Sequence, residues 1–70
     1  MTMRDFNGLS ESGKKDVIDL WGDLITEKFI PSYYVKVYEL NGFFVEVYYQ
    51  PQKREVKRYR TCMRRATVCD

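Results

Sequence analysis

Histidine and long apolar runs are both absent from the 70-residue sequence. Without histidine, no side chain has an ordinary pKa suited to moving protons near neutral pH, and a zinc site lacks one of its common ligands. No stretch approaches the roughly 18 apolar residues of a membrane-spanning helix. The first residues also lack the apolar run of a secretory signal. We therefore expect a non-enzymatic cytoplasmic protein with no cofactor, no metal and no membrane association.

Cysteine is scarce, with only Cys62 and Cys69 present. The reducing cytoplasm disfavours a disulfide between them. If the C-terminus is helical, a spacing of seven residues places them about 10 Å apart, which is too far for a disulfide. In an extended tail the two cysteines are close enough to pair, so their redox state stays open.

Charge is distributed unevenly along the chain, although the net charge is only +2. Residues 1–50 contain five Lys/Arg against eight Asp/Glu, whereas residues 51–70 contain seven against two. Aromatic residues make up 16% of the sequence and include six tyrosines, which favours β-structure. The sequence therefore predicts one small domain with an acidic first part and a basic end.

The first 30 residues predict an N-terminal arm over 1–9 and an amphipathic helix over 10–30. Ser10 or Ser12 is suited to cap the helix, and Pro31 is expected to end it. The apolar residues recur at helical spacing at Val17, Ile18, Leu20, Trp21, Leu24 and Ile25. The opposite side carries an acidic ridge, either a solvated face or a docking site for a basic partner, at Asp16, Asp19, Asp23 and Glu27.

Residues 33–61 predict a three-stranded antiparallel β-meander. Asn41-Gly42 suits a two-residue type I′ turn, because both central residues of that turn need positive φ. Pro51 begins a second turn, followed by a charged third strand over 55–61. Residues 62–70 form either a short helix or a tail. The fold class is therefore α+β, with one helix packed on the meander.

The turn at Asn41-Gly42 fixes which hairpin residues share a face of the sheet. Leu40 faces Phe43 and Tyr38 faces Val45, on the side that we expect the helix to cover. The other face carries an apolar patch, which usually marks an interaction site, at Tyr33, Val35, Val37, Phe44 and Tyr48. Three explanations stay open: the chain's own ends cover the patch, two copies pack as a homodimer, or a different protein binds there.

Seven basic residues lie within thirteen positions, with Tyr59 among them. Basic residues interleaved with aromatics suit nucleic acid, although an acidic protein partner or a solubilising strand edge would explain them too. The α-β-β-β-α order is similar to that of double-stranded RNA-binding domains, which is a fold-level analogy only. The basic residues are Lys53, Arg54, Lys57, Arg58, Arg60, Arg64 and Arg65.

The hairpin sequence resembles that of small uncharacterised bacterial αβββ proteins. The residues that carry the resemblance are Tyr38-Glu39-Leu40, the run from Phe43 to Tyr49, and Arg58-Tyr59-Arg60, with Phe6, Leu9 and Gly22 fitting more loosely. The resemblance implies the fold and no particular activity.

The sequence predicts a non-catalytic interaction or regulatory module, of the kind found among small bacterial or phage regulators, that acts by protein contacts. Self-association through the open sheet face is the expected mode, because a chain this short buries little apolar surface alone. The alternative is a nucleic-acid-binding protein that uses the basic third strand and tail.

Overall fold

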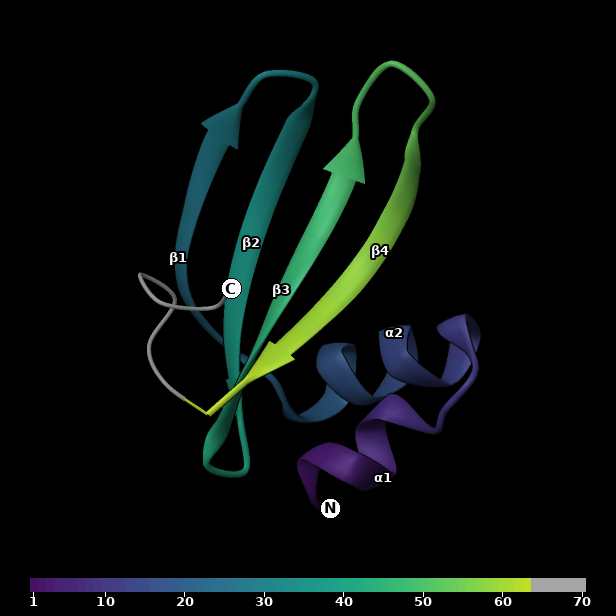
Figure 1. Cartoon of the computed structure of the whole chain (residues 1–70), viewed down its shortest axis with the longest axis vertical. Coiled ribbons are helices and arrows are strands. Elements are labelled where there is room, and N and C mark those ends of the chain that lie inside the picture. Colours follow the sequence, from purple (N-terminus) through teal and green to yellow (C-terminus); the bar gives the residue numbers. More distant parts are fainter. Residues whose placement is uncertain (64–70) are drawn as a thin grey trace.

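Two helices precede a four-stranded antiparallel sheet in the computed structural model, which describes residues 1–63. The strands follow one another as a meander in the order β1-β2-β3-β4 (Figure 1). This arrangement confirms the α+β class, but the sheet has four strands where three were expected. The elements are α1 (Met3–Asn7), α2 (Glu11–Trp21), β1 (Asp23–Ile30), β2 (Tyr33–Leu40), β3 (Phe43–Gln50) and β4 (Glu55–Cys62).

The helix predicted over 10–30 ends at Trp21, and the rest of that segment is strand β1. The N–H of Gly22 donates to the carbonyl of Ile18 at 2.9 Å and closes the helix. Gly22 itself has extended backbone angles, φ −77° and ψ 140°. The β-forming residues Thr26 and Phe29 then continue into a strand that pairs with β2. Leu24 and Ile25 matched the helical period by coincidence.

The acidic ridge expected along one helix is divided between two elements. Asp16 and Asp19 lie on α2, where Asp19 forms an ion pair with Lys15 at 2.8 Å. Asp23 and Glu27 belong to β1. A continuous acidic helix face is therefore absent from this part of the chain.

Both helices begin at capping residues. The hydroxyl of Ser10 accepts from the backbone N–H of Gly13 at 3.1 Å, which confirms Ser10 as the cap of α2. The predicted arm contains α1, whose capping box joins Thr2 and Asp5 through two hydrogen bonds of 3.1 Å.

The predicted hairpin is confirmed in turn and in register. Asn41 has φ 49° and Gly42 has φ 90°, as a type I′ turn requires. Leu40 pairs with Phe43, and Tyr38 pairs with Val45. The Asn41 side-chain amide also donates to the carbonyl oxygen of Met1, which ties the start of the chain to this turn.

The two other turns of the meander differ in how well the sequence predicted them. Pro31, expected only to end a helix, instead belongs to the turn between β1 and β2, where Ser32 has φ 73°. The turn before β4 forms as predicted, with the N–H of Arg54 donating to the carbonyl of Pro51 at 3.3 Å.

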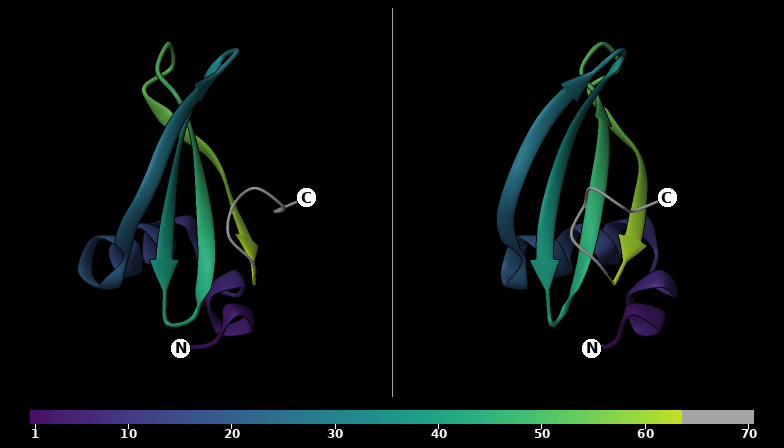
Figure 2. Two further views of the ribbon diagram at one scale, coloured as in Figure 1. Left: turned by 90° about the vertical axis from the view of Figure 1, so that its left-hand side faces the viewer. Right: turned by 60° about the vertical axis from the view of Figure 1, so that its left-hand side comes forward.

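The core lies between the helices and one end of the helix-side face of the sheet. Its buried members are Phe6, Ile18, Leu40, Phe43 and Val45. This is the face that the sequence predicted the helix to cover. Figure 2 shows that both helices gather at the end of the sheet that holds the β2–β3 turn.

A short helix or tail was predicted over 62–70. Its first residue, Cys62, is instead the last residue of β4. Residues 64–70 lie outside the described part of the chain. The predictions for Arg64, Arg65 and the pairing of Cys62 with Cys69 therefore fall on residues that the structure does not describe.

Candidate interaction surface

Helix α2 is too short to cover the face of the sheet on which it packs. Its 11 residues span about 16 Å at 1.5 Å per residue. The strands have 8 residues each, or about 27 Å. The helix also crosses the strands near one end instead of running along them (Figures 1 and 2). The half of the helix-side face near the β1–β2 and β3–β4 turns is therefore left without a helix.

Four apolar side chains form a row across this helix-free half. Phe29 pairs with Tyr34, Tyr34 pairs with Tyr49, and Tyr49 pairs with Val56. Directly paired residues of neighbouring strands point to the same face. We call this set, Phe29, Tyr34, Tyr49 and Val56, the aromatic row.

Phe29 is the most exposed member of the aromatic row. Its side chain is 80% exposed, and its ring stacks on that of Tyr34 with centroids 4.6 Å apart. Tyr34, Tyr49 and Val56 are half-buried. The stacking holds Phe29 against the sheet while leaving its outer surface open.

A groove lies between α2 and the sheet, and it is lined in part by Tyr34, Tyr49 and Val56 of the aromatic row. Its volume is about 270 Å³, and its floor is formed by Tyr34, Tyr38, Tyr49 and Tyr59. Lys15 and Asp19 of α2 line one side. A rigid aromatic floor of this kind offers large contact area at low cost in side-chain entropy.

The charged side chains around the groove balance one another. The ammonium group of Lys36 lies 5.5 Å from the ring centroid of Tyr34, and Lys36 pairs with Glu27 in the β1–β2 register. On α2 the Lys15–Asp19 ion pair provides one charge of each sign. Two acids therefore accompany two bases around an apolar centre.

Tyr59 sits where the groove meets the core. Its ring contacts Phe6 edge-on, with centroids 6.4 Å apart, and the Lys14 ammonium lies 5.8 Å from its centroid. Burial, followed by the nearby carboxylate of Glu11, raises the pKa of Tyr59 above its ordinary value. Tyr59 therefore belongs both to the lining of the groove and to the packing around Phe6.

The patch predicted on the far face is assembled but largely enclosed. Tyr33, Val35, Val37, Phe44 and Tyr48 share that face, yet Val35 and Val37 are 0% and 1% exposed. The central side chains of the expected patch are therefore buried within the protomer, and binding of a partner at this face stays a prediction.

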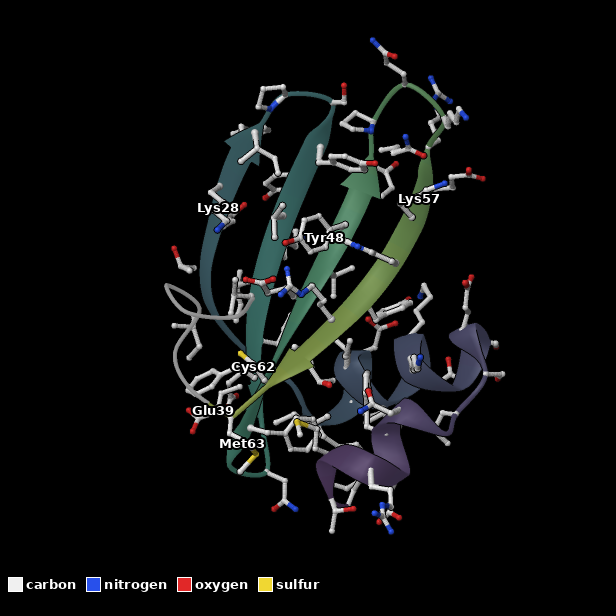
Figure 3. The ribbon with its side chains drawn as sticks, viewed as in Figure 1. Lys28, Glu39, Tyr48, Lys57, Cys62 and Met63 are labelled. Carbon is white, nitrogen blue, oxygen red and sulfur yellow. The ribbon has the colours of Figure 1, made fainter. Side chains whose placement is uncertain are left out.

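Tyr48 shows how neighbouring side chains enclose the far face. The guanidinium of Arg58 lies 4.7 Å from its ring centroid, and the ring of Tyr33 packs edge-on at 5.8 Å. Its hydroxyl donates to the carboxylate of the buried Glu46 at 2.9 Å. Figure 3 shows Tyr48 in the middle of the sheet, between Lys28 on β1 and Lys57 on β4.

The predicted basic residues lie on and beside the β4 edge. Lys53 and Arg54 are exposed in the turn before β4, and Lys57 and Arg58 are exposed on the strand. The β3–β4 register shifts between Tyr48 and Tyr49, which leaves Lys57 at a bulge. Arg60 is half-buried and pairs with Glu46. The exposed bases thus gather at the end of the molecule away from the helices.

Sequence reasoning missed Phe29 and the strand that carries it. A local signal for β1 was present, because Thr26, Phe29 and Ile30 favour strands and Pro31-Ser32 is a short turn. The apparent helical stripe through Leu24 and Ile25 outweighed this signal.

Comparison with protein-family models, curated proteins and solved structures finds no match for this chain. The resemblance to small bacterial αβββ proteins therefore stays a prediction. Within residues 1–63, no group of three potential metal-ligating side chains comes together. Neither helix of this region is long and apolar enough to cross a membrane. The aromatic row and its groove are the candidate site that the fold itself builds.

Proposed function

We propose that this chain is a non-catalytic interaction module that binds protein through the aromatic row. The supporting observation is the 80% exposure of Phe29 at the end of a row that no helix covers. Exposed apolar patches on small proteins mark interaction surfaces, and tyrosine is enriched at interfaces. The proposal assigns no catalytic step, because the sequence has no histidine to transfer protons near neutral pH.

Binding would work by burying aromatic rings on a preformed platform. A fully buried aromatic side chain removes about 150–250 Å² from water, and Phe29, at 80% exposure, has most of its surface still to bury. Tyr34 and Tyr49 lie on the two central strands and pair directly, so a partner need not order this backbone. Preorganisation of this kind lowers the entropic cost of association.

The test compares photoactivatable residues at two neighbouring positions of β1. One replaces Phe29, which belongs to the aromatic row, and the control replaces Lys28, which is also exposed but points to the other face of the strand. We expect irradiation in cells to give a discrete protein adduct from position 29 and none of the same mass from position 28. No adduct from position 29, or the same adduct from both positions, would contradict the proposal.

Nucleic-acid binding is a second candidate function. It is supported by the four exposed bases near the β3–β4 turn: Lys53, Arg54, Lys57 and Arg58. Contacts to phosphates make affinity fall with salt, so fluorescence anisotropy with double-stranded and single-stranded RNA is the suitable assay. Replacing Lys53 by glutamate should reduce the salt slope by about 1, with Lys28→Glu as the matched control. Absence of salt-dependent binding would exclude this candidate.

A further inference from the structure

We propose that the partner of the aromatic row is a second copy of this chain, packed face to face and antiparallel. In this dimer the β3–β4 turn of each copy lies against α2 of the other. The inference rests on the proposed function, since it names the partner of the same surface. Three features of the protomer support it: balanced charge, layer thickness, and the separation of acidic and basic segments.

The surface around the aromatic row is self-complementary in charge. Its acids are Glu27 and Asp19, and its bases are Lys36 and Lys15. A two-fold dimer brings the same patch of both copies together, so a patch of one sign would repel itself. A neutral patch with an apolar centre meets the requirement for pairing with itself.

The thickness of the helix layer determines how a second copy can fit. Two sheets pack face to face about 10 Å apart, and a helix with its side chains is also about 10–12 Å thick. A second sheet on the helix-free half therefore lies at the level of α2. If the two copies ran parallel, both α2 helices would compete for the same space. In the antiparallel arrangement, the end of each sheet meets the side of the other copy's α2.

The turn at the end of the sheet carries two bases, whereas α2 carries three acids against two bases. Lys53 and Arg54 occupy the turn at the end of the sheet, and α2 lies at the other end of the same protomer (Figure 1). They cannot meet within one copy. Antiparallel pairing brings Lys53 of one copy toward Asp19, which lines the groove on α2 of the other. In this arrangement the basic β3–β4 turn of one copy therefore attracts Asp19 on α2 of the other copy.

A mixing experiment tests this contact, using Asp19→Lys and Lys53→Glu made as separate proteins. Each variant alone places like charges together twice in its own dimer. An exposed ion pair contributes at most about 1 kcal/mol, or about fivefold in an equilibrium constant. Because each dimer contains this contact twice, each variant should dimerise more weakly than the wild type, by up to about 25-fold. Mixed in equal amounts, the two variants make attractive pairs at both contacts. Sedimentation equilibrium should therefore show that the mixture dimerises as tightly as the wild type.

Controls separate loss of the contact from loss of the fold. Circular dichroism checks each variant, and Asp19→Asn replaces Asp19→Lys if the latter does not fold, in which case the mixture should recover one of its two attractive contacts. Lys28→Glu, which changes an exposed charge on the other face of β1, should leave the dimer constant unchanged within about twofold, well inside the effect of an exposed ion pair.

Two results would overturn the dimer. One is a wild-type chain that stays monomeric at all concentrations, and the other is a mixture that associates no better than its separate variants. A photo-adduct between position 29 and a different protein would reject self-association while supporting the proposed function. Failure to form any adduct would reject both.

Discussion

Phe6 and Phe29 both place an aromatic ring on the helix-side face of the sheet, yet Phe6 is 0% and Phe29 80% exposed. Phe6 lies at the end covered by the helices, where it contacts Phe43 with ring centroids 6.0 Å apart. Phe29 lies at the end that no helix reaches. The helix-covered end and the helix-free end of the sheet do not differ in residue type, because both are rich in aromatic and β-branched side chains. The difference comes from where the two helices lie, which is at one end of the sheet (Figure 2).

The position of α2 across one end of the strands therefore divides one sheet face into two surfaces (Figures 1 and 2). Residues under the helices contribute burial to the stability of the fold. Phe29, the most exposed member of the aromatic row, contributes little burial and remains available for contact. This division predicts that substitutions in the two halves have effects of different kinds, which can be measured separately.

The largest predicted contrast is between Phe6→Ala and Phe29→Ala. Removing the buried Phe6 ring leaves a cavity and should lower the free energy of unfolding by about 3–5 kcal/mol. Removing Phe29 loses mainly its stacking on Tyr34 and should cost about 0.5–1.5 kcal/mol. Urea denaturation followed by circular dichroism measures both. Equal losses in the two variants would show that the division between the halves is wrong.

A smaller contrast concerns two glycines at the two ends of α2. A Cβ on Gly22 would lie 2.8 Å from the Ile18 carbonyl oxygen, so Gly22→Ala should destabilise the fold by about 1–3 kcal/mol. A Cβ on Gly13 meets nothing closer than 3.4 Å, and alanine is the better helix former. Gly13→Ala should therefore gain up to about 1 kcal/mol. Thermal melting of both variants tests whether tight packing at Gly22 fixes the end of the helix.

Removal of the α2 cap should have an effect of about 1 kcal/mol. Ser10→Ala loses the hydrogen bond from the Gly13 N–H, and such losses typically cost about 1 kcal/mol. Ser12→Ala serves as the matched control, since Ser12 lies inside the helix at an exposed position. Chemical denaturation should show a lower free energy of unfolding for Ser10→Ala only. Equal losses in the two variants would show that Ser10 does not act as the cap.

The smallest predicted effect is a pH dependence from Tyr59, at the boundary between the halves. Burial raises the pKa of Tyr59 above its ordinary value of 10.0, so the folded state holds this proton more tightly than the unfolded state does. The resulting contribution to stability is present below pH 10 and is lost as pH rises through the raised pKa. Unfolding free energies from pH 8 to 11 should fall more steeply for the wild type than for Tyr59→Phe. Parallel curves would contradict this assignment.

The sequence predicted those parts of the fold that depend on local chemistry. Asn41-Gly42 determines a type I′ turn, and that turn fixes the β2–β3 register, so both were confirmed. The end of α2 could not be predicted from local chemistry, because Leu24 and Ile25 fit the spacing of a helix and are also suited to a strand. Only the pairing of β1 with β2 decides between them, and that pairing is a tertiary contact.

The burial of the predicted interaction patch could not be read from the sequence for a related reason. Alternation along β2 and β3 correctly placed Val35, Val37 and Tyr48 together on the far face. Burial, however, depends on which side chains lie over a face, such as Arg58 over Tyr48, and alternation does not supply that information. The aromatic row depended on recognising β1, so it could not be assembled from the sequence without that strand.

The most direct test of the central claim is sedimentation equilibrium of the wild type and Phe29→Ser over a range of concentrations. We predict that the wild type reaches about twice the 8.4 kDa chain mass, and that Phe29→Ser stays near one chain mass with a nearly unchanged unfolding midpoint. A wild type that remains at one chain mass, or a Phe29→Ser variant that dimerises equally well, would contradict self-association through the aromatic row.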